Sequence, residues 1–217
     1  MTSHRFSSLL LAAAACATFA ATLSACAPLV VGGAAVGAAM VLTDRRTAGI
    51  VVEDERIELR AASLVRENFG DKVHVNANSY NRQVLLTGEV PDANTKQQVE
   101  QLVGRIQNVK GIVNELAVLG ATTLQQRSND VLVTGKVRAS FVDASDLAAN
   151  AFRVVTERGT VYLMGRVTQR EADRATQIAR TVPGVQRVVR IFEYIDEGEL
   201  RRTQAATPAQ PPASAAR

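Results

Sequence analysis

The sequence predicts an α+β protein in which two copies of one small domain follow each other, each with the order helix, strand, strand, helix, strand. The first observation is an internal repeat: residues 84–90 (VLLTGEV) match 161–167 (VYLMGRV), and residues 109–118 (VKGIVNELAV) match 185–194 (VQRVVRIFEY). The second is that apolar residues alternate in the segments predicted as strands and recur every three or four residues in the predicted helices. A repeat of this length indicates two copies of one fold.

The first copy is predicted over residues 53–119. Apolar residues at helical spacing predict a first helix that ends near Gly70. These residues are Ile57, Ala61, Leu64, Val65 and Phe69. The later predicted elements are strands at 73–77 and 84–88 with a turn at 79–82 between them, a helix that opens at Pro91 and Asp92, and a strand at 112–119.

The second copy is predicted over residues 128–195. Its first helix carries Val133, Val137 and Phe141 at a stride of four. The later predicted elements are a hairpin of strands 152–156 and 161–167 around Arg158-Gly159, a helix at 168–181 that Pro183-Gly184 ends, and a strand at 185–195. Gly88 and Gly165 occupy equivalent places in the two copies, which indicates a backbone role for both.

Residues 1–25 are predicted to be a signal peptide, with an apolar stretch that runs from Leu9 to Leu23. The stretch ends in a motif that resembles the lipobox of bacterial lipoproteins, formed by Leu23, Ser24, Ala25 and Cys26. Small residues suit the peptidase beside the cleaved bond, and the Cys26 thiol is the predicted site of lipid attachment. The alternative is an ordinary signal peptide with an unrelated cysteine. Cys16 lies within the signal, so no disulfide is expected in the mature chain.

Three further segments are predicted to lie outside the two copies. Residues 26–52 are expected to be the lipidated N-terminus and a tether, because residues 27–43 are apolar but mainly small. A packing helix with small residues at its contact face is the alternative for the tether. Residues 120–127 are predicted to be a linker. Residues 196–217 are rich in Ala, Pro, Gln and Thr and are predicted to be a disordered tail.

The residue content argues against an enzyme. The sequence has no evident Ser-His-Asp set, zinc-ligand cluster or phosphate-binding glycine loop. His74 is the one histidine beyond the signal and alternates with Val73 and Val75, so it is expected to face away from the core. Glu53 and Asp54 are explained more simply by a helix dipole than by acid–base chemistry. We therefore expect no catalytic residue, no metal, no cofactor and no small-molecule substrate.

The two copies differ in charge. Residues 53–119 carry 8 Lys and Arg against 10 Asp and Glu, whereas residues 128–195 carry 10 against 7. A positive domain on a membrane-tethered chain is attracted to anionic headgroups; a merely solvated face is the alternative. The export signal and an aromatic content of only 4% argue against nucleic acid as a partner.

The repeated pattern of apolar-Leu-x-Gly-x-Val, then a helix, then Val-x-x-Val resembles the BON domain family. Residues 43–56, 128–130, 136–138 and 161–165 are also similar to that family. Two such copies behind a lipobox resemble the dual-BON outer-membrane lipoproteins. The resemblance implies two BON-like αββαβ domains, each a three-stranded mixed sheet packed on two helices. It also implies a lipid anchor in the outer membrane facing the periplasm, no enzymatic activity, and a role in envelope integrity and at the division site.

The resemblance further implies that the second domain binds anionic phospholipid through its first helix. Here the side of that helix opposite the core stripe places apolar Leu132 beside Lys136, which suits insertion among lipid headgroups. Leu132 and Gly135 stand where the resemblance leads us to expect an aromatic residue and a threonine. The predicted lipid-binding residues are Leu132, Gly135, Lys136, Arg138 and Ala139. The alternative is that Leu132 packs against the first domain.

Two classes of function therefore remain. The first is a non-enzymatic outer-membrane lipoprotein that binds an anionic phospholipid membrane. The second is a periplasmic scaffold that docks on an outer-membrane or cell-wall assembly, with outer-membrane proteins as its partners. Ala27, rather than Asp, follows Cys26, which favours the outer membrane under the sorting rule of enteric bacteria.

Overall fold

The computed structural model describes residues 44–205. The described residues all belong to one compact unit. The predicted signal, the lipobox residues with Cys26, the tether up to residue 43 and the tail after residue 205 lie outside the described residues.

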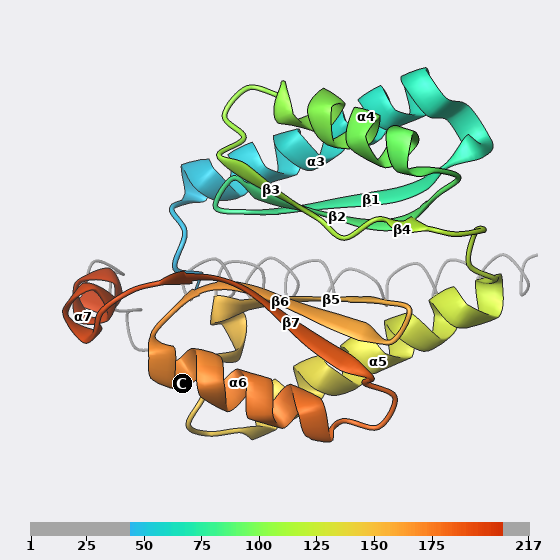
Figure 1. Ribbon diagram of the computed structural model, residues 1–217. Helices are drawn as coiled ribbons and strands as arrows, with labels where there is room; N and C mark the ends of the chain where they lie inside the picture. The colour runs from blue at the N-terminus through green and yellow to red at the C-terminus, as the bar shows by residue number, and fades with distance from the viewer. Residues whose placement is uncertain (1–43, 206–217) are drawn as a thin grey trace, which may run out of the picture. The chain divides into compact units, whose positions relative to one another are not determined.

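The first repeat has the predicted order of elements. Its helices are α3 (Ala48–Phe69) and α4 (Ala93–Gly104), with a short 3-10 turn η1 (Gly70–Lys72) after α3. Its strands are β1 (His74–Tyr80), β2 (Gln83–Val90), β3 (Gly111–Asn114) and β4 (Ala117–Val118). β2 pairs antiparallel with β1 and parallel with β3 and β4. The predicted third strand is thus divided into β3 and β4, and both helices cover one face of the sheet (Figure 1).

The second repeat repeats this arrangement. Its elements are α5 (Leu124–Asp143), η2 (Ala149–Ala151), β5 (Phe152–Glu157), β6 (Thr160–Val167), α6 (Gln169–Thr181) and β7 (Arg187–Tyr194), followed by α7 (Glu197–Ala205). β6 pairs antiparallel with β5 and parallel with β7. Helices α5 and α6 cover one face of this sheet (Figure 1). The fold class predicted from the sequence, with two αββαβ copies and mixed sheets on paired helices, is confirmed.

Each repeat has its own apolar core between its helices and its sheet. In the first repeat Ile57, Ala61 and Val65 of α3 pack in one buried cluster with Val84 and Leu86 of β2. In the second repeat the equivalent cluster contains the following residues of α5 and β6: Val133, Val137, Phe141, Val161 and Leu163. The stride-four pattern of both helices therefore identified the core side correctly.

One buried aspartate in each repeat fastens the first helix to the turn of the β-hairpin. The Asp54 carboxylate accepts the backbone N–H groups of Asn81 and Arg82 at 2.8 and 2.7 Å. The Asp130 carboxylate accepts those of Arg158 and Gly159 at 2.8 and 2.9 Å. All four turn residues have positive φ, as a tight two-residue hairpin requires. Explaining Asp54 by a helix dipole was therefore wrong: α3 begins at Ala48, and Asp54 is a buried hydrogen-bond acceptor.

The glycines predicted to have a backbone role allow close approach between strands. Gly88 has φ +112°, and a Cβ there would collide with the carbonyl oxygen of His74. A Cβ on Gly165 would lie 2.6 Å from the carbonyl oxygen of Ala151. Both glycines lie in the second strand of their repeat. Gly88 allows β1 to approach β2 closely, and Gly165 allows the residue just before β5 to approach β6 closely.

The two repeats contact each other within this compact unit. Tyr80 and Leu85 of the first repeat form a buried cluster with Tyr162 and Met164 of the second. Arg153 forms an ion pair with Glu58 at 2.8 Å at the same interface. The sheet faces that the helices leave uncovered are therefore buried between the repeats.

Residues just before α3 also join the second repeat. The buried Arg45 guanidinium pairs with both carboxylate oxygens of Glu171 at 2.6 and 2.8 Å and donates to the carbonyl of Arg166 at 3.0 Å. Glu171 also completes the capping box of α6 with Thr168. Burial acts to raise the pKa of Glu171, but the hydrogen bonds from Arg45 and from the Thr168 N–H outweigh it and hold that pKa below 4.5.

Three predicted boundaries were wrong. Residues 48–52, predicted as part of the tether, belong to α3. Half of the predicted linker 120–127 is helical, because Thr123 and Gln126 form a capping box that starts α5 at Leu124. Residues 197–205, predicted as disordered, form α7. Asp196 accepts the Glu199 N–H at 2.7 Å, and Leu200 is buried, so the start of the tail has both a helix cap and an apolar anchor.

Candidate functional site

Helix α5 has apolar residues on both of its sides. Its inner side is buried and holds Asp130, Val133, Val137 and Phe141. Its outer side also exposes large aliphatic side chains, namely Leu124 (80% exposed), Val131 (70%), Leu132 (62%) and Val142 (70%). The core does not use these residues, so this second apolar side needs another explanation.

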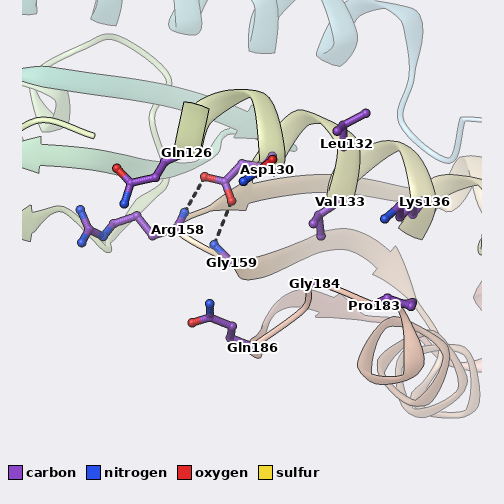
Figure 2. A pocket seen from close by; sticks show the side chains of 11 residues that line it. Gln126, Asp130, Leu132, Val133, Lys136, Arg158, Gly159, Pro183, Gly184 and Gln186 are labelled. Atoms are coloured by element: carbon purple, nitrogen blue, oxygen red, sulfur yellow. Dashed lines mark hydrogen bonds between the residues drawn. The ribbon is translucent and has the colours of Figure 1, made fainter. Parts of the chain in front are cut away.

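The five residues predicted to bind lipid all lie on the exposed part of α5. Leu132 points away from the strands, whereas Val133 points toward them (Figure 2). A Cβ on Gly135 would have no neighbour within 4 Å. Arg138 donates to the carbonyl of Val154 at 3.3 Å. The Leu132 side chain is 62% exposed, so it is not buried against the first repeat.

The exposed aliphatic residues form one strip along the helix. At 3.6 residues per turn, Leu124, Val131, Leu132 and Val142 fall within an arc of about 100°. The same geometry places Lys136 on one flank of this strip and Arg138 on the other. No described residue makes an ion pair with either cation. We call these six residues, together with Gly135 and Ala139, the α5 face.

The sequence prediction found only part of the α5 face. It identified Leu132 but missed Leu124, Val131 and Val142. The three missed residues could have been found from the sequence, because they also recur at helical spacing once the core stripe has been assigned.

The equivalent helix of the first repeat does not have this strip. Equivalent buried residues of α3 and α5 are 76 positions apart in the sequence, for example Asp54 and Asp130. On this alignment Glu55, Arg56 and Arg66 stand where α5 has Val131, Leu132 and Val142. The aliphatic strip is therefore a property of the second repeat and not of the fold.

A cavity of about 670 Å³ adjoins the α5 face. One side of the cavity is lined by Leu132 and Lys136 of α5. The other side is lined by Pro183, Gly184 and Gln186, which belong to the loop that leads to β7. Figure 2 shows Leu132 and Lys136 on the helix that also carries Asp130. The cavity puts a recess with both polar and apolar lining directly beside the aliphatic strip.

A second polar group lies at the contact between the repeats. His74 Nδ1 lies 2.9 Å from Glu89 Oε2, and Glu157 accepts from the Asn76 amide at 3.3 Å. His74 was expected to be a simple exposed strand residue; instead it is partly buried and paired. Burial acts to raise the pKa of Glu89, but hydrogen bonds from His74 and Thr122 lower it overall. Burial and the nearby Glu89 charge raise the pKa of Glu157.

None of the helices between residues 44 and 205 is long and apolar enough to cross a membrane.

The family model of the BON domain matches the chain twice, at residues 53–120 and 129–195. The chain belongs to the BON domain family, and the resemblance seen in the sequence is confirmed. It is 36% identical over 176 residues to the outer membrane lipoprotein DolP of Haemophilus influenzae, an alignment that covers 80% of this chain and 91% of that protein. It is 30% identical over 154 residues to a 21 kDa hemolysin of Actinobacillus pleuropneumoniae, covering 70% of this chain and 79% of that one.

A solved structure of CdsD, a structural protein of the type III secretion system of Chlamydia trachomatis, aligns with 73% of this chain and 99% of its own length. The sequence identity is 14% and the TM-score is 0.29, so this likeness supports no conclusion about function.

Proposed function

We propose that this protein is a lipid-anchored outer-membrane protein, not an enzyme, whose second BON repeat binds anionic phospholipid through the α5 face. The observation that carries the proposal is the strip of four exposed aliphatic side chains flanked by Lys136 and Arg138. The likeness to an outer membrane lipoprotein over 80% of the chain supports the location.

The aliphatic strip supports insertion into the interface of a bilayer. Fully burying one Leu or Val side chain contributes about 1.5–3 kcal/mol, so partial insertion of four such side chains gives a substantial contribution. Amphipathic helices that lie on membranes combine an apolar strip of this kind with flanking Lys and Arg residues. The apolar contribution is therefore larger than Leu132 by itself would supply.

The flanking cations support a preference for anionic headgroups. A Lys or Arg near an anionic membrane surface contributes about 1 kcal/mol. Lys136 makes no hydrogen bond or ion pair with any described residue and is free to meet a phosphate. Among residues 44–205, the Arg138 guanidinium makes one hydrogen bond, to the Val154 carbonyl of β5 at 3.3 Å. Binding should weaken as salt rises, because exposed charges are screened over about 8 Å at physiological ionic strength.

The proposal is tested by co-sedimentation of the lipid-free fragment 44–217 with vesicles. We expect binding to vesicles that contain phosphatidylglycerol and little binding to pure phosphatidylcholine vesicles. Lys136→Glu should weaken binding to anionic vesicles more than Leu132→Ala, because it reverses a charge while the other three aliphatic residues remain. Equal binding to both vesicle types, or unchanged binding by Lys136→Glu, would contradict the proposal.

Binding at the inner surface of the outer membrane would support envelope integrity and would allow the protein to gather at the division site. Deletion of the gene should then increase sensitivity to detergents and large antibiotics. Restored resistance with the parent chain, but not with a chain that has a charged α5 face, would link the phenotype to lipid binding.

A groove in the first repeat favours a second function, docking of a partner protein on an envelope assembly. This groove of about 490 Å³ lies between α3 and α4. Its apolar floor includes Ile57 and Leu102, and Arg56, Arg60 and Arg105 lie around it. Such a groove suits an acidic segment with apolar residues. Photo-crosslinking from position 60 in cells would test this function: a discrete protein adduct supports it, whereas crosslinks only to lipid argue against it.

A further inference from the structure

Three potential metal ligands meet at the contact between the repeats. His74 on β1 and Glu89 on β2 are direct partners in the antiparallel register. Glu157, at the end of β5, comes from the second repeat. One ligand atom from each residue lies within 4.8 Å of the others. Three strands from two repeats therefore place an imidazole and two carboxylates at one point.

The two carboxylates differ in how their burial is compensated. Glu89 accepts hydrogen bonds from the N–H and Oγ1 of Thr122 and lies 2.9 Å from His74 Nδ1, whereas Glu157 is poorly compensated. Glu89 is 2% exposed and Glu157 is 8% exposed. Within residues 44–205, the Glu157 carboxylate accepts one side-chain hydrogen bond, from the neutral Asn76 amide at 3.3 Å. The nearest cation to Glu89 is Arg158, at 3.5 Å, and its side chain is 36% exposed. Burying carboxylates costs free energy unless charges or strong hydrogen bonds compensate them, and a divalent cation would supply such compensation.

We propose that His74, Glu89 and Glu157 bind one divalent transition-metal ion, with zinc as the best fit, and that this ion joins the two BON repeats. Imidazole nitrogen and carboxylate oxygen are normal zinc ligands at about 2.0–2.2 Å. Zinc would take the place of the hydrogen bond between His74 and Glu89, and the Glu157 carboxylate would move inward. Water would complete the coordination.

The surroundings allow entry of an ion and hold the ligands in place. A cavity of about 390 Å³ reaches His74 and Glu157 and is bordered by Arg127 and Val131 of α5. Gly88 packs against His74 so closely that a Cβ would lie 3.4 Å from its Nδ1. This site does not depend on lipid binding, so either proposal can fail without the other.

The ligands could not be expected from the sequence, which predicted no metal site. His74 and Glu89 are 15 residues apart, and Glu157 lies in the other repeat. Only the cross-strand register and the contact between the repeats bring them together.

The test is titration of the full chain with zinc against a chromophoric chelator. The protein is purified in non-ionic detergent without a histidine tag, because a tag would bind zinc itself. We expect about one zinc per chain and a rise in the midpoint of thermal unfolding when zinc is added, since an ion bound only by the folded state stabilises that state. His74→Gln and Glu157→Gln should each weaken binding at least about tenfold.

The variants are chosen so that misfolding cannot explain a loss. Gln at position 74 still offers a donor to Glu89, and Gln at position 157 removes a buried charge, so both should fold without metal. Glu58→Gln is the matched control, because it removes another carboxylate at the same interface, the one that pairs with Arg153. Zinc binding by the parent and by Glu58→Gln, but not by the other two variants, supports the site. No binding by the parent, or equal binding by all variants, overturns it.

Discussion

Arg45 and Glu171 lie 126 residues apart in the chain, yet their guanidinium and carboxylate groups meet through two hydrogen bonds of 2.6 and 2.8 Å. Both side chains are almost fully buried. This pair connects the chain just before α3 to the first turn of α6. It therefore ties the N-terminal end of the described residues to the repeat that carries the α5 face.

The pair should make stability depend on pH in the acid range. The pKa of Glu171 in the folded chain lies below 4.5, so its contribution is fully present above pH 4.5 and is lost as the pH falls through the folded-state value. Arg45→Met should leave a buried carboxylate unpaired and cost about 3 kcal/mol near pH 7. Urea unfolding at several pH values measures both effects. If the stability of the parent and that of Glu171→Gln changed with pH in the same way below pH 4.5, this prediction would be contradicted.

The aspartate that holds the hairpin turn should matter to folding in each repeat. Asp130→Ala leaves the N–H groups of Arg158 and Gly159 without their acceptor and should cost about 2–3 kcal/mol. Asp130→Asn keeps one acceptor oxygen and should cost less. Chemical unfolding followed by circular dichroism measures the difference. If Asp130→Ala were as stable as the parent, the turn would not depend on this carboxylate.

Three glycines should respond differently to alanine. Gly88→Ala should destabilise the chain most, because the position has positive φ and a Cβ would strike the backbone of β1. Gly165→Ala meets a backbone oxygen at 2.6 Å and should also destabilise. Gly135 lies in the exposed part of α5 with open space around it, so Gly135→Ala should stabilise the helix by up to about 1 kcal/mol. Thermal unfolding midpoints rank the three, and a stabilising Gly88→Ala would contradict the ranking.

The core sides of the helices and the order of the elements could be predicted because they depend on local periodicity. Val133, Val137 and Phe141 showed the core side of α5 directly. The role of Asp130 could not be predicted in the same way, because its partners lie 28 and 29 residues away. One signal was available: an aspartate recurs at equivalent places in both helices, at Asp54 and Asp130.

The partner of His74 needed information that periodicity does not contain. Alternation places a strand residue on one face of a sheet, but it does not say which residue lies opposite on the next strand. The register pairs His74 with Glu89. The helix α7 was missed for a different reason, since the composition of the whole tail concealed the cap at Asp196 and the apolar Leu200.

Lipid attachment at Cys26 is predicted from the sequence only, because the residue lies outside the described part of the structure. Cys26→Ser should leave a precursor that keeps its signal peptide and has no attached lipid. A stable bilayer anchor needs more than one acyl chain, which a diacylglyceryl cysteine provides. Mass spectrometry and membrane fractionation of the variant check this. A normally processed, membrane-bound Cys26→Ser chain would show that the motif is not a lipobox.

The most direct test of the account is the affinity of fragment 44–217 for anionic vesicles when the strip of the α5 face is made polar. The variant carries Val131→Gln, Leu132→Gln and Val142→Gln, and Gln is compatible with an exposed helix. The matched control carries Val52→Gln and Leu59→Gln, which replace exposed aliphatic residues on α3 of the first repeat. We predict that the α5 variant binds at least about tenfold more weakly than the parent, since three side chains lose their insertion energy, and that the α3 control binds like the parent. Equal binding by the parent and the α5 variant would contradict the claim that this helix meets the membrane.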